Sequence, residues 1–377
     1  MLRAIPFAFV ALLACAGFAS AATQPAHALD RSLARLVAMR GGPTGTIAVV
    51  QRGAVRAVHR AGVGDRRART PIRSTDHMRM ASTSKAFSGA VALALVDQGV
   101  LSLEDTIAQR LPALPAAWGP VTLRQLLDHT SGLPDFTQAK TYLATLGRTP
   151  HKLFLPHETL LSYVESDPLD FAPGSQYHYS NSDNVVVALM AEQATGQSYD
   201  DLLASQVFKP LGLDQTRLPD GFRLPVPYLH GYDNQGDPPQ DLSTALSMSS
   251  VWASGGVVSS PIDATAFVRG YVGRQLFGQA TQDQQLQLVA GHSEPTGPGA
   301  NAAGLGIFRY RTRCGTVYGH TGNFPGYTQF FAATLDGERS VTVSISEQLN
   351  EEMTGTQLKV FNALRRTEET AVCAALD

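Results

Sequence analysis

Ser82 and Lys85, three residues apart, form the pair in this sequence best suited to nucleophilic chemistry. They precede the apolar run Val91-Ala92-Leu93-Ala94-Leu95-Val96, which is closed by Gly99, so the pattern predicts a buried helix that begins near Ser82. Residues three apart on a helix face the same way, which would place an amine beside a hydroxyl at the electropositive helix end. That setting can lower the lysine pKa and activate the serine. A Ser/Thr cluster before a helix is more commonly a simple cap, so the pair needs support from elsewhere.

Two further short patterns lie later in the chain: Tyr179-Ser180-Asn181, before an apolar helix pattern, and His320-Thr321-Gly322, within a strand pattern. Each is weak alone, and a His-Thr-Gly sequence is typical of an ordinary strand end. Together with Ser82 and Lys85 they supply what acyl transfer needs: a nucleophile, groups that move its proton and polar groups that hold a substrate. His129 lies in an Asp-His-Thr-Ser-Gly turn after a short helix pattern, where a structural hydrogen bond is the more common role.

The ordered triple resembles the serine β-lactamase-like and penicillin-binding superfamily, and most of all the branch that holds secreted D-alanyl-D-alanine carboxypeptidases and class C β-lactamases. Residues 126–134, 173–174 and 207–213 also look like that branch. Ser182-Asp183-Asn184 spells the S-D-N motif of class A enzymes and is an alternative second motif. Tyr179-Ser180-Asn181 is favoured, because Asp183 and Asn184 lead straight into the helix pattern.

The resemblance implies a role for each matched residue. Ser82 would attack, and Lys85 and Tyr179 would share the proton transfers, without a decision on which of them is the base. Asn181 would hold the substrate amide, and the backbone N–H groups of Ser82 and Asn323 would form the oxyanion hole. The further candidates for substrate contact are His320, Thr321, Gly322, Asn323 and Trp252. Class C enzymes usually have Lys at position 320, whereas His occurs in related carboxypeptidases, esterases and amidases.

The elements that must position these residues follow from periodicity. Leucines at helical spacing from Leu29 to Leu36 predict a first helix, and strand patterns follow at 46–50 and 55–58. Helices and loops then dominate until about residue 250. Four strand patterns follow, and a last helix pattern closes the chain; these lie at 304–313, 315–320, 327–334, 340–346 and 354–372.

We therefore expect one α/β lobe built from both chain ends, about 28–99 and 251–377, with a helical lobe of about 100–250 inserted between them. The expected fold class is α/β plus all-α: a β-lactamase/transpeptidase-like antiparallel sheet flanked by helices, with an inserted helical lobe.

The first residues are typical of a secretory signal, with Arg3, an apolar core from Ile5 to Phe18 and an A-x-A site at Ala19-Ser20-Ala21. We expect residues 1–21 to be removed, leaving 22–377 as one periplasmic or secreted catalytic unit without a stable membrane span. Two cysteines, Cys314 and Cys373, would remain, and an even pair in an exported chain suggests one disulfide.

The charge and the residue patterns of the chain exclude several classes of binding partner. The net charge of −2 argues against nucleic acid. No His/Cys/Glu cluster has metal-ligand spacing, and Gly304-x-Gly306 lacks the third glycine of a dinucleotide-binding loop, so neither a metal nor another cofactor is expected. The oligomeric state is open.

The function expected from these observations is an exported serine hydrolase that forms an acyl-enzyme, similar to a D-alanyl-D-alanine carboxypeptidase and acylated by penicillins. A class C-like β-lactamase and an esterase or D-amino-acid amidase on the same scaffold are the alternatives within enzymes. A penicillin-recognising sensor without turnover is the alternative from another class. The cation for a substrate carboxylate is not identified; Arg309, Arg311 and Arg313 alternate on one strand, although a solvated face explains them as well.

Overall fold

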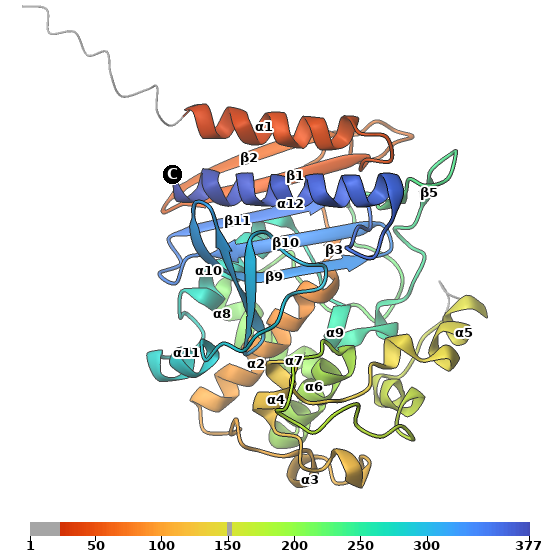
Figure 1. The fold of residues 1–377 in the computed structure, drawn as a ribbon, viewed down its shortest axis with the longest axis vertical. Coiled ribbons are helices and arrows are strands. Elements are labelled where there is room, and N and C mark those ends of the chain that lie inside the picture. Colours follow the sequence, from red (N-terminus) through yellow and green to blue (C-terminus); the bar gives the residue numbers. More distant parts are fainter. Residues whose placement is uncertain (1–22, 149–152) are drawn as a thin grey trace, which may run out of the picture.

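The structure, a computed structural model, describes residues 23–148 and 153–377. A large sheet forms one part of the molecule and a group of short helices forms the other, with both described chain ends on the sheet side (Figure 1). The predicted signal segment, residues 1–21, lies outside the described residues.

Seven antiparallel strands form the main sheet in the order β2-β1-β11-β10-β9-β8-β7. The N-terminal hairpin joins the C-terminal strands through β1 and β11, where Thr46 lies opposite Ile345. The prediction that both chain ends build one sheet is confirmed. The strands are β1 (Gly45–Arg52), β2 (Val55–Gly62), β7 (Ala300–Gly304), β8 (Ile307–Thr312), β9 (Gly315–Phe324), β10 (Tyr327–Ala333) and β11 (Arg339–Ile345), and a small separate pair is β3 (Met78–Arg79) with β6 (Val258–Ser259).

The strand predicted at 304–313 is incorrect at its beginning. The chain turns at Leu305 and Gly306, so that β7 and β8 form a hairpin at the sheet edge. Gly306 adopts φ 64°, a conformation that favours glycine. The turn escapes the sequence pattern because Leu305 is apolar and buried, which makes the turn look like the beginning of β8 and leaves β7 unpredicted.

Helices cover both faces of the sheet. α1 (Thr23–Ala38) and α12 (Gly355–Leu376) lie side by side on one face (Figure 1), and α10 (Pro261–Val272) packs against the other. The leucines of the predicted first helix, from Leu29 to Leu36, are buried in the core between these helices and the sheet. The spacing that predicted a helix therefore also gave its buried face.

α2 (Ser84–Asp97) runs from the sheet into the helical part and ends before Gly99, which adopts φ 72°. It is buried over nearly its whole length, as its apolar sequence predicts, and forms part of the largest hydrophobic core. The boundaries proposed for the two lobes stay a prediction. The other helices are α3 (Ile107–Arg110), α4 (Leu123–Leu127), α5 (Lys140–Arg148), α6 (Asn181–Thr195), α7 (Tyr199–Leu203), α8 (Lys209–Leu211), α9 (Trp252–Gly255) and α11 (Gln279–Gln285).

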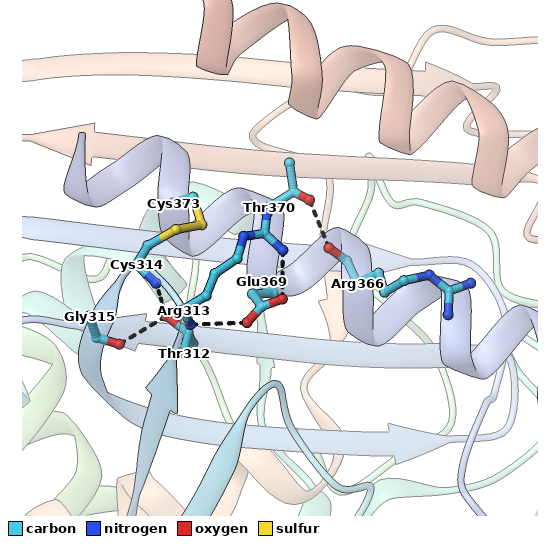
Figure 2. Close-up of a disulfide and its surroundings, with 8 residues drawn as sticks. All are labelled: Thr312, Arg313, Cys314, Gly315, Arg366, Glu369, Thr370 and Cys373. Carbon is cyan, nitrogen blue, oxygen red and sulfur yellow. Dashed lines mark hydrogen bonds and ion pairs between the residues drawn. A yellow bond between two sulfur atoms is a disulfide. The ribbon is translucent and has the colours of Figure 1, made fainter.

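Cys314 and Cys373 form a disulfide with a Cα–Cα distance of 5.2 Å. It ties the turn between β8 and β9 to the last helix, and the adjacent Arg313 Nη1 contacts Glu369 Oε2 at 2.7 Å (Figure 2). The pairing suggested by the cysteine count is therefore present.

Replacing both cysteines with serine should lower the free energy of unfolding by about 2–4 kcal/mol, because the link closes a long loop in the unfolded chain. Thermal unfolding of the double variant measures the loss. Thiol titration of unreduced, denatured protein beginning at residue 22 should find no free thiol. Two titratable thiols, or an unchanged Tm in the variant, would contradict a stabilising bridge.

Candidate active site

Ser82 lies in a short turn of 3-10 helix, η1 (Ala81–Thr83), which continues directly into α2. The third motif runs against this turn. A Cβ atom at Gly322 would lie only 2.6 Å from the Ser82 backbone nitrogen and 2.7 Å from that of Thr83. Position 322 therefore has to be glycine for β9 to approach the nucleophile this closely.

The Lys85 amine is the centre of the site. Its Nζ lies 3.2 Å from Ser82 Oγ, 2.7 Å from Asn181 Oδ1 and 2.8 Å from the Ser254 carbonyl oxygen. Burial lowers the pKa of Lys85 to about 7, although nearby carboxylates, led by that of Asp135, oppose this shift. Asn181 Oδ1 and the Ser254 carbonyl can only accept hydrogen bonds. A neutral amine that donates to both therefore points its lone pair at Ser82.

Tyr179 is buried beside this pair, with Lys85 Nζ 4.8 Å from the centre of its ring. Burial raises the pKa of Tyr179 well above 10, and the neighbouring Ser82 hydroxyl partly opposes the shift. Within the described chain the phenol has no hydrogen-bond partner of normal geometry. Tyr179 is thus a near neighbour of Ser82 but not its hydrogen-bond partner, because a hydrogen bond requires a suitable distance and angle. The raised pKa keeps the phenol protonated at neutral pH.

Asn181 connects Lys85 to a carboxylate that the sequence did not reveal. Its Nδ2 donates to Asp135 Oδ2 at 2.8 Å and to Thr137 Oγ1 at 3.1 Å, while its Oδ1 accepts from Lys85. Both amide protons are thus already used, so Asn181 orients Lys85, and the predicted contact with a substrate amide would require these bonds to open.

The S-D-N alternative points into the protein. Ser182 Oγ donates to the Pro134 carbonyl at 2.6 Å, and Asn184 Nδ2 donates to Ser88 Oγ at 2.7 Å. Asp183 accepts hydrogen bonds from His129 and Ser131. The residue that reaches Lys85 is Asn181, of the Tyr179-Ser180-Asn181 motif.

A cavity of about 500 Å³, called the Ser82 cavity below, opens at the nucleophile; Tyr179, Asn181 and Asn323 also line it. A larger hollow of about 630 Å³ is formed by residues from 37–69 and 234–239. We take the smaller one as the site, because it contains the nucleophile and its neighbours.

The walls of the Ser82 cavity are acidic and apolar. Four carboxylates line it, and none of its described lining residues is Lys or Arg. His292 is the one basic side chain among them, while Lys85 lies buried beneath the floor. The carboxylates belong to Asp135, Glu294, Glu351 and Glu352, and apolar lining comes from Tyr142, Leu143, Leu146, Leu246, Val251 and Phe324.

Glu294 has the most perturbed of these carboxylates. Desolvation by the surrounding protein raises the pKa of Glu294 to about 7, while the nearby His292 opposes this rise and the Glu351 carboxylate adds to it. The side chain of Glu294 is exposed to solvent, which screens its interactions with the neighbouring charges. The charge of Glu294 raises the pKa values of Lys85 and Tyr179, so Glu294 lies near the reacting groups.

Four predicted contact residues are absent from the described lining of the Ser82 cavity: Gly322, which packs against the Ser82 turn, and His320, Thr321 and Trp252. The His320 ring is buried edge-to-face against Phe308 at 4.9 Å, and burial lowers its pKa to about 3. Thr321 Oγ1 donates to the Pro295 carbonyl. Trp252 is buried with its ring stacked on His157 at 4.0 Å. Each of these three side chains already packs within the protein, and their contact with substrate stays a prediction.

The strand that carries the third motif, β9, lies inside the sheet between β10 and β8. Its pairing with β8 ends at Gly319, whereas its pairing with β10 continues to Phe324. The segment beside Ser82 is thus unpaired with β8 and behaves locally as an edge. The arginines considered for a substrate carboxylate lie elsewhere on β8 and its turn, with Arg311 exposed and Arg313 held by Glu369.

Comparison with known proteins agrees with this geometry. The profile of the Beta-lactamase family matches residues 29–362, which is most of the chain. The chain belongs to the Beta-lactamase family. It is thus a member of the serine β-lactamase and penicillin-binding superfamily and has its fold.

Among curated proteins, the chain is 24% identical to Penicillin-binding protein 4* of Bacillus subtilis (strain 168), over 79% of this chain and 66% of that protein. It is 29% identical to a D-aminopeptidase of Brucella anthropi, over 76% of this chain and 52% of that protein. The chain thus spans about two-thirds of the first relative and about half of the second.

Among solved structures, a D-stereospecific amidohydrolase from Streptomyces sp. matches with a TM-score of 0.74 at 26% identity, covering 85% of this chain and 94% of the other. The D-amino acid amidase from Ochrobactrum anthropi SV3 in complex with D-phenylalanine matches with a TM-score of 0.78 at 23% identity, covering 92% and 98%. At that identity the second match shows the fold alone.

Two further observations concern the described residues only. None of their helices combines the length and apolar character needed to cross a membrane. No group of three or more His, Cys, Asp or Glu side chains among them is arranged to hold a metal ion.

Proposed function

We propose that this serine hydrolase cleaves amide or peptide bonds that follow a D-amino acid with a free amino group, in the manner of a D-aminopeptidase or D-amino-acid amidase. The observation that carries the proposal is the charge of the Ser82 cavity, whose described lining holds four carboxylates and no Lys or Arg. Such a cavity attracts a substrate ammonium group and repels a carboxylate. The names of the relatives support D configuration and a free amine.

The acyl transfer follows from the groups around Ser82, which are the Lys85 amine, the Tyr179 phenol and two backbone N–H groups. Neutral Lys85 takes the proton of Ser82 as Oγ attacks the substrate carbonyl carbon, and backbone N–H groups of Ser82 and Asn323 stabilise the resulting oxyanion. Protonated Tyr179 donates its proton to the leaving nitrogen as the C–N bond breaks, and the ammonium of Lys85 then returns a proton to Tyr179. Water then attacks the acyl-enzyme as Lys85 takes its proton, and Lys85 returns that proton to Ser82 Oγ as the ester bond breaks and the amino acid is released.

Lys85 is the better base of the two groups that the sequence left open. Burial lowers its pKa to about 7, so a large fraction is neutral at working pH. The same burial raises the pKa of Tyr179 well above 10, which disfavours a phenolate base and favours a phenol that donates.

A carboxypeptidase acting on D-alanyl-D-alanine is less well supported. Its leaving group carries a carboxylate, and in the described cavity wall the only cationic candidate is His292. His320 does not supply the charge either, because burial lowers its pKa to about 3 and its ring faces Phe308. Penicillins, which also carry a carboxylate, should acylate Ser82 slowly.

Matched substrates test the proposal. D-phenylalanine p-nitroanilide should be hydrolysed at least tenfold faster, as kcat/KM, than its N-acetyl derivative, because acetylation removes the charge that the cavity recognises. Glu294→Gln should raise KM for the free amine several-fold and leave the N-acetyl substrate unaffected, whereas Glu338→Gln, at a distant exposed carboxylate, should change neither. The proposal would be wrong if the N-acetyl substrate were hydrolysed faster. It would also be wrong if the main activity were release of D-alanine from an acetylated D-alanyl-D-alanine peptide.

We also propose that the enzyme is exported to the periplasm or the exterior. The signal-like sequence of residues 1–21 supports this, as does the disulfide, because such bonds persist in oxidising compartments.

A further inference from the structure

His129 was expected to be a simple hydrogen-bonding residue of a turn, but its surroundings link it to the acyl-transfer groups. It follows α4 with φ 60°, a conformation that is uncommon outside glycine and is most often adopted there by Asn, Asp and His, and it is buried. Its side chain must therefore be held by specific contacts that offset the backbone strain.

Those contacts fix the orientation of the imidazole ring. Nδ1 lies 2.7 Å from Asp183 Oδ2, and Asp183 Oδ1 accepts from Ser131 Oγ at 2.5 Å. Burial raises the pKa of Asp183 well above its usual value, and the hydrogen bond from Ser131 opposes this shift. With a carboxylate that accepts from both neighbours, His129 Nδ1 carries the proton of a neutral ring. Burial lowers the pKa of His129 to about 3, and the nearby charge of Lys85 adds to the shift, so the ring stays neutral at working pH.

The face of this ring supports the catalytic tyrosine. The ring centres of His129 and Tyr179 are 4.4 Å apart, and Tyr177 approaches His129 edge-on at 6.2 Å. The His129 carbonyl also accepts a hydrogen bond from the His178 backbone nitrogen at 2.9 Å, so the segment that carries both tyrosines is attached to His129 through backbone and side chain.

We propose that His129, oriented by Asp183, is a positioning residue that holds the Tyr179 ring beside Lys85 and keeps water from the Lys85 amine. The inference rests on the proposed acyl transfer at Ser82. It does not depend on the substrate, because any acylating agent needs the same placement of Lys85 and Tyr179.

The rate at which a fluorophosphonate or penicillin probe acylates Ser82 is therefore the readout. His129→Asn keeps a donor for Asp183 and tolerates the positive φ, but it removes the ring. It should slow acylation at least tenfold. It should also move the ascending limb of the rate-against-pH profile to higher pH, since water reaching Lys85 relieves its desolvation while Asp135, Glu294 and Asp183 remain.

Ser131→Ala is the matched control, because it removes the other hydrogen bond to Asp183 without touching Tyr179. It should lower Tm about as much as His129→Asn does and leave the acylation rate within about threefold. Equal slowing in both variants, or a wild-type rate and pH profile in His129→Asn, would overturn the inference.

If His129→Asn does not fold, Asp183→Asn replaces it in the experiment. Slowed acylation in that variant supports the proposal, and a wild-type rate refutes it. Absence of any labelling in the wild type would instead count against the acyl-transfer proposal itself.

Discussion

Replacing Lys85 with methionine should lower kcat/KM by about 10²–10⁴-fold, because it removes the base that takes the Ser82 proton. Methionine fills a similar volume but cannot accept a proton. Activity is measured with D-phenylalanine p-nitroanilide, and acylation with the same probe as above. A variant that keeps more than a tenth of the wild-type acylation rate would show that another group, most plainly Tyr179, deprotonates Ser82.

The same substitution should change how stability depends on pH. The pKa of Lys85 is about 7 in the folded protein, against 10.5 for an ordinary lysine, so between these values the unfolded chain binds more protons. Wild-type stability should therefore rise between pH 7 and 10.5 by on the order of 5 kcal/mol from this residue, and the contribution is lost as pH falls toward 7. The methionine variant should lack this rise. Parallel Tm-against-pH curves for the two proteins would contradict a buried amine of lowered pKa.

Gly322→Ala should reduce kcat by about 10²–10³-fold, the loss expected when an oxyanion donor is misplaced. The added Cβ would lie 2.6 Å from the Ser82 nitrogen and 3.0 Å from the Met80 carbonyl oxygen. Both are backbone atoms, so the nucleophile turn or β9 must shift to relieve the contact.

Gly221→Ala is the control for that experiment, because a Cβ at position 221 meets no atom within 4 Å in the described structure. It should leave kcat and Tm unchanged. Near-normal kcat in Gly322→Ala would mean that the approach of β9 to Ser82 is not required for catalysis.

Sequence spacing predicted the groups that lie on regular elements. Ser82 and Lys85 are one helical turn apart, so their contact follows from local geometry. Asn181 begins α6, and its contact with Lys85 depends on how α2 packs against α6. The order of the motifs implied this packing only through the resemblance to a known family. The sheet followed from strand patterns at both ends, apart from the β7–β8 turn.

The acidic wall could not be predicted. Asp135 and Glu294 are single carboxylates in loops, far apart in sequence, and no periodicity marks either. Their common location depends on tertiary packing around Asn181 and Ser82. His320 was expected from its motif to contact substrate, whereas in the fold its ring is buried against Phe308. His129 likewise gained its link to Tyr179 only from the fold.

On the proposed function, Ser82 forms an acyl-enzyme with D-amino acids that bear a free amine. Intact-protein mass spectrometry, following wild type and Ser82→Ala over time after mixing with D-phenylalanine methyl ester and separately with its N-acetyl derivative, tests it most directly. We expect a transient D-phenylalanyl adduct on the wild type only, mapped to the peptide containing Ser82, with little or none from the N-acetyl ester. An adduct of equal size on Ser82→Ala, or one formed only from the N-acetyl ester, would contradict it.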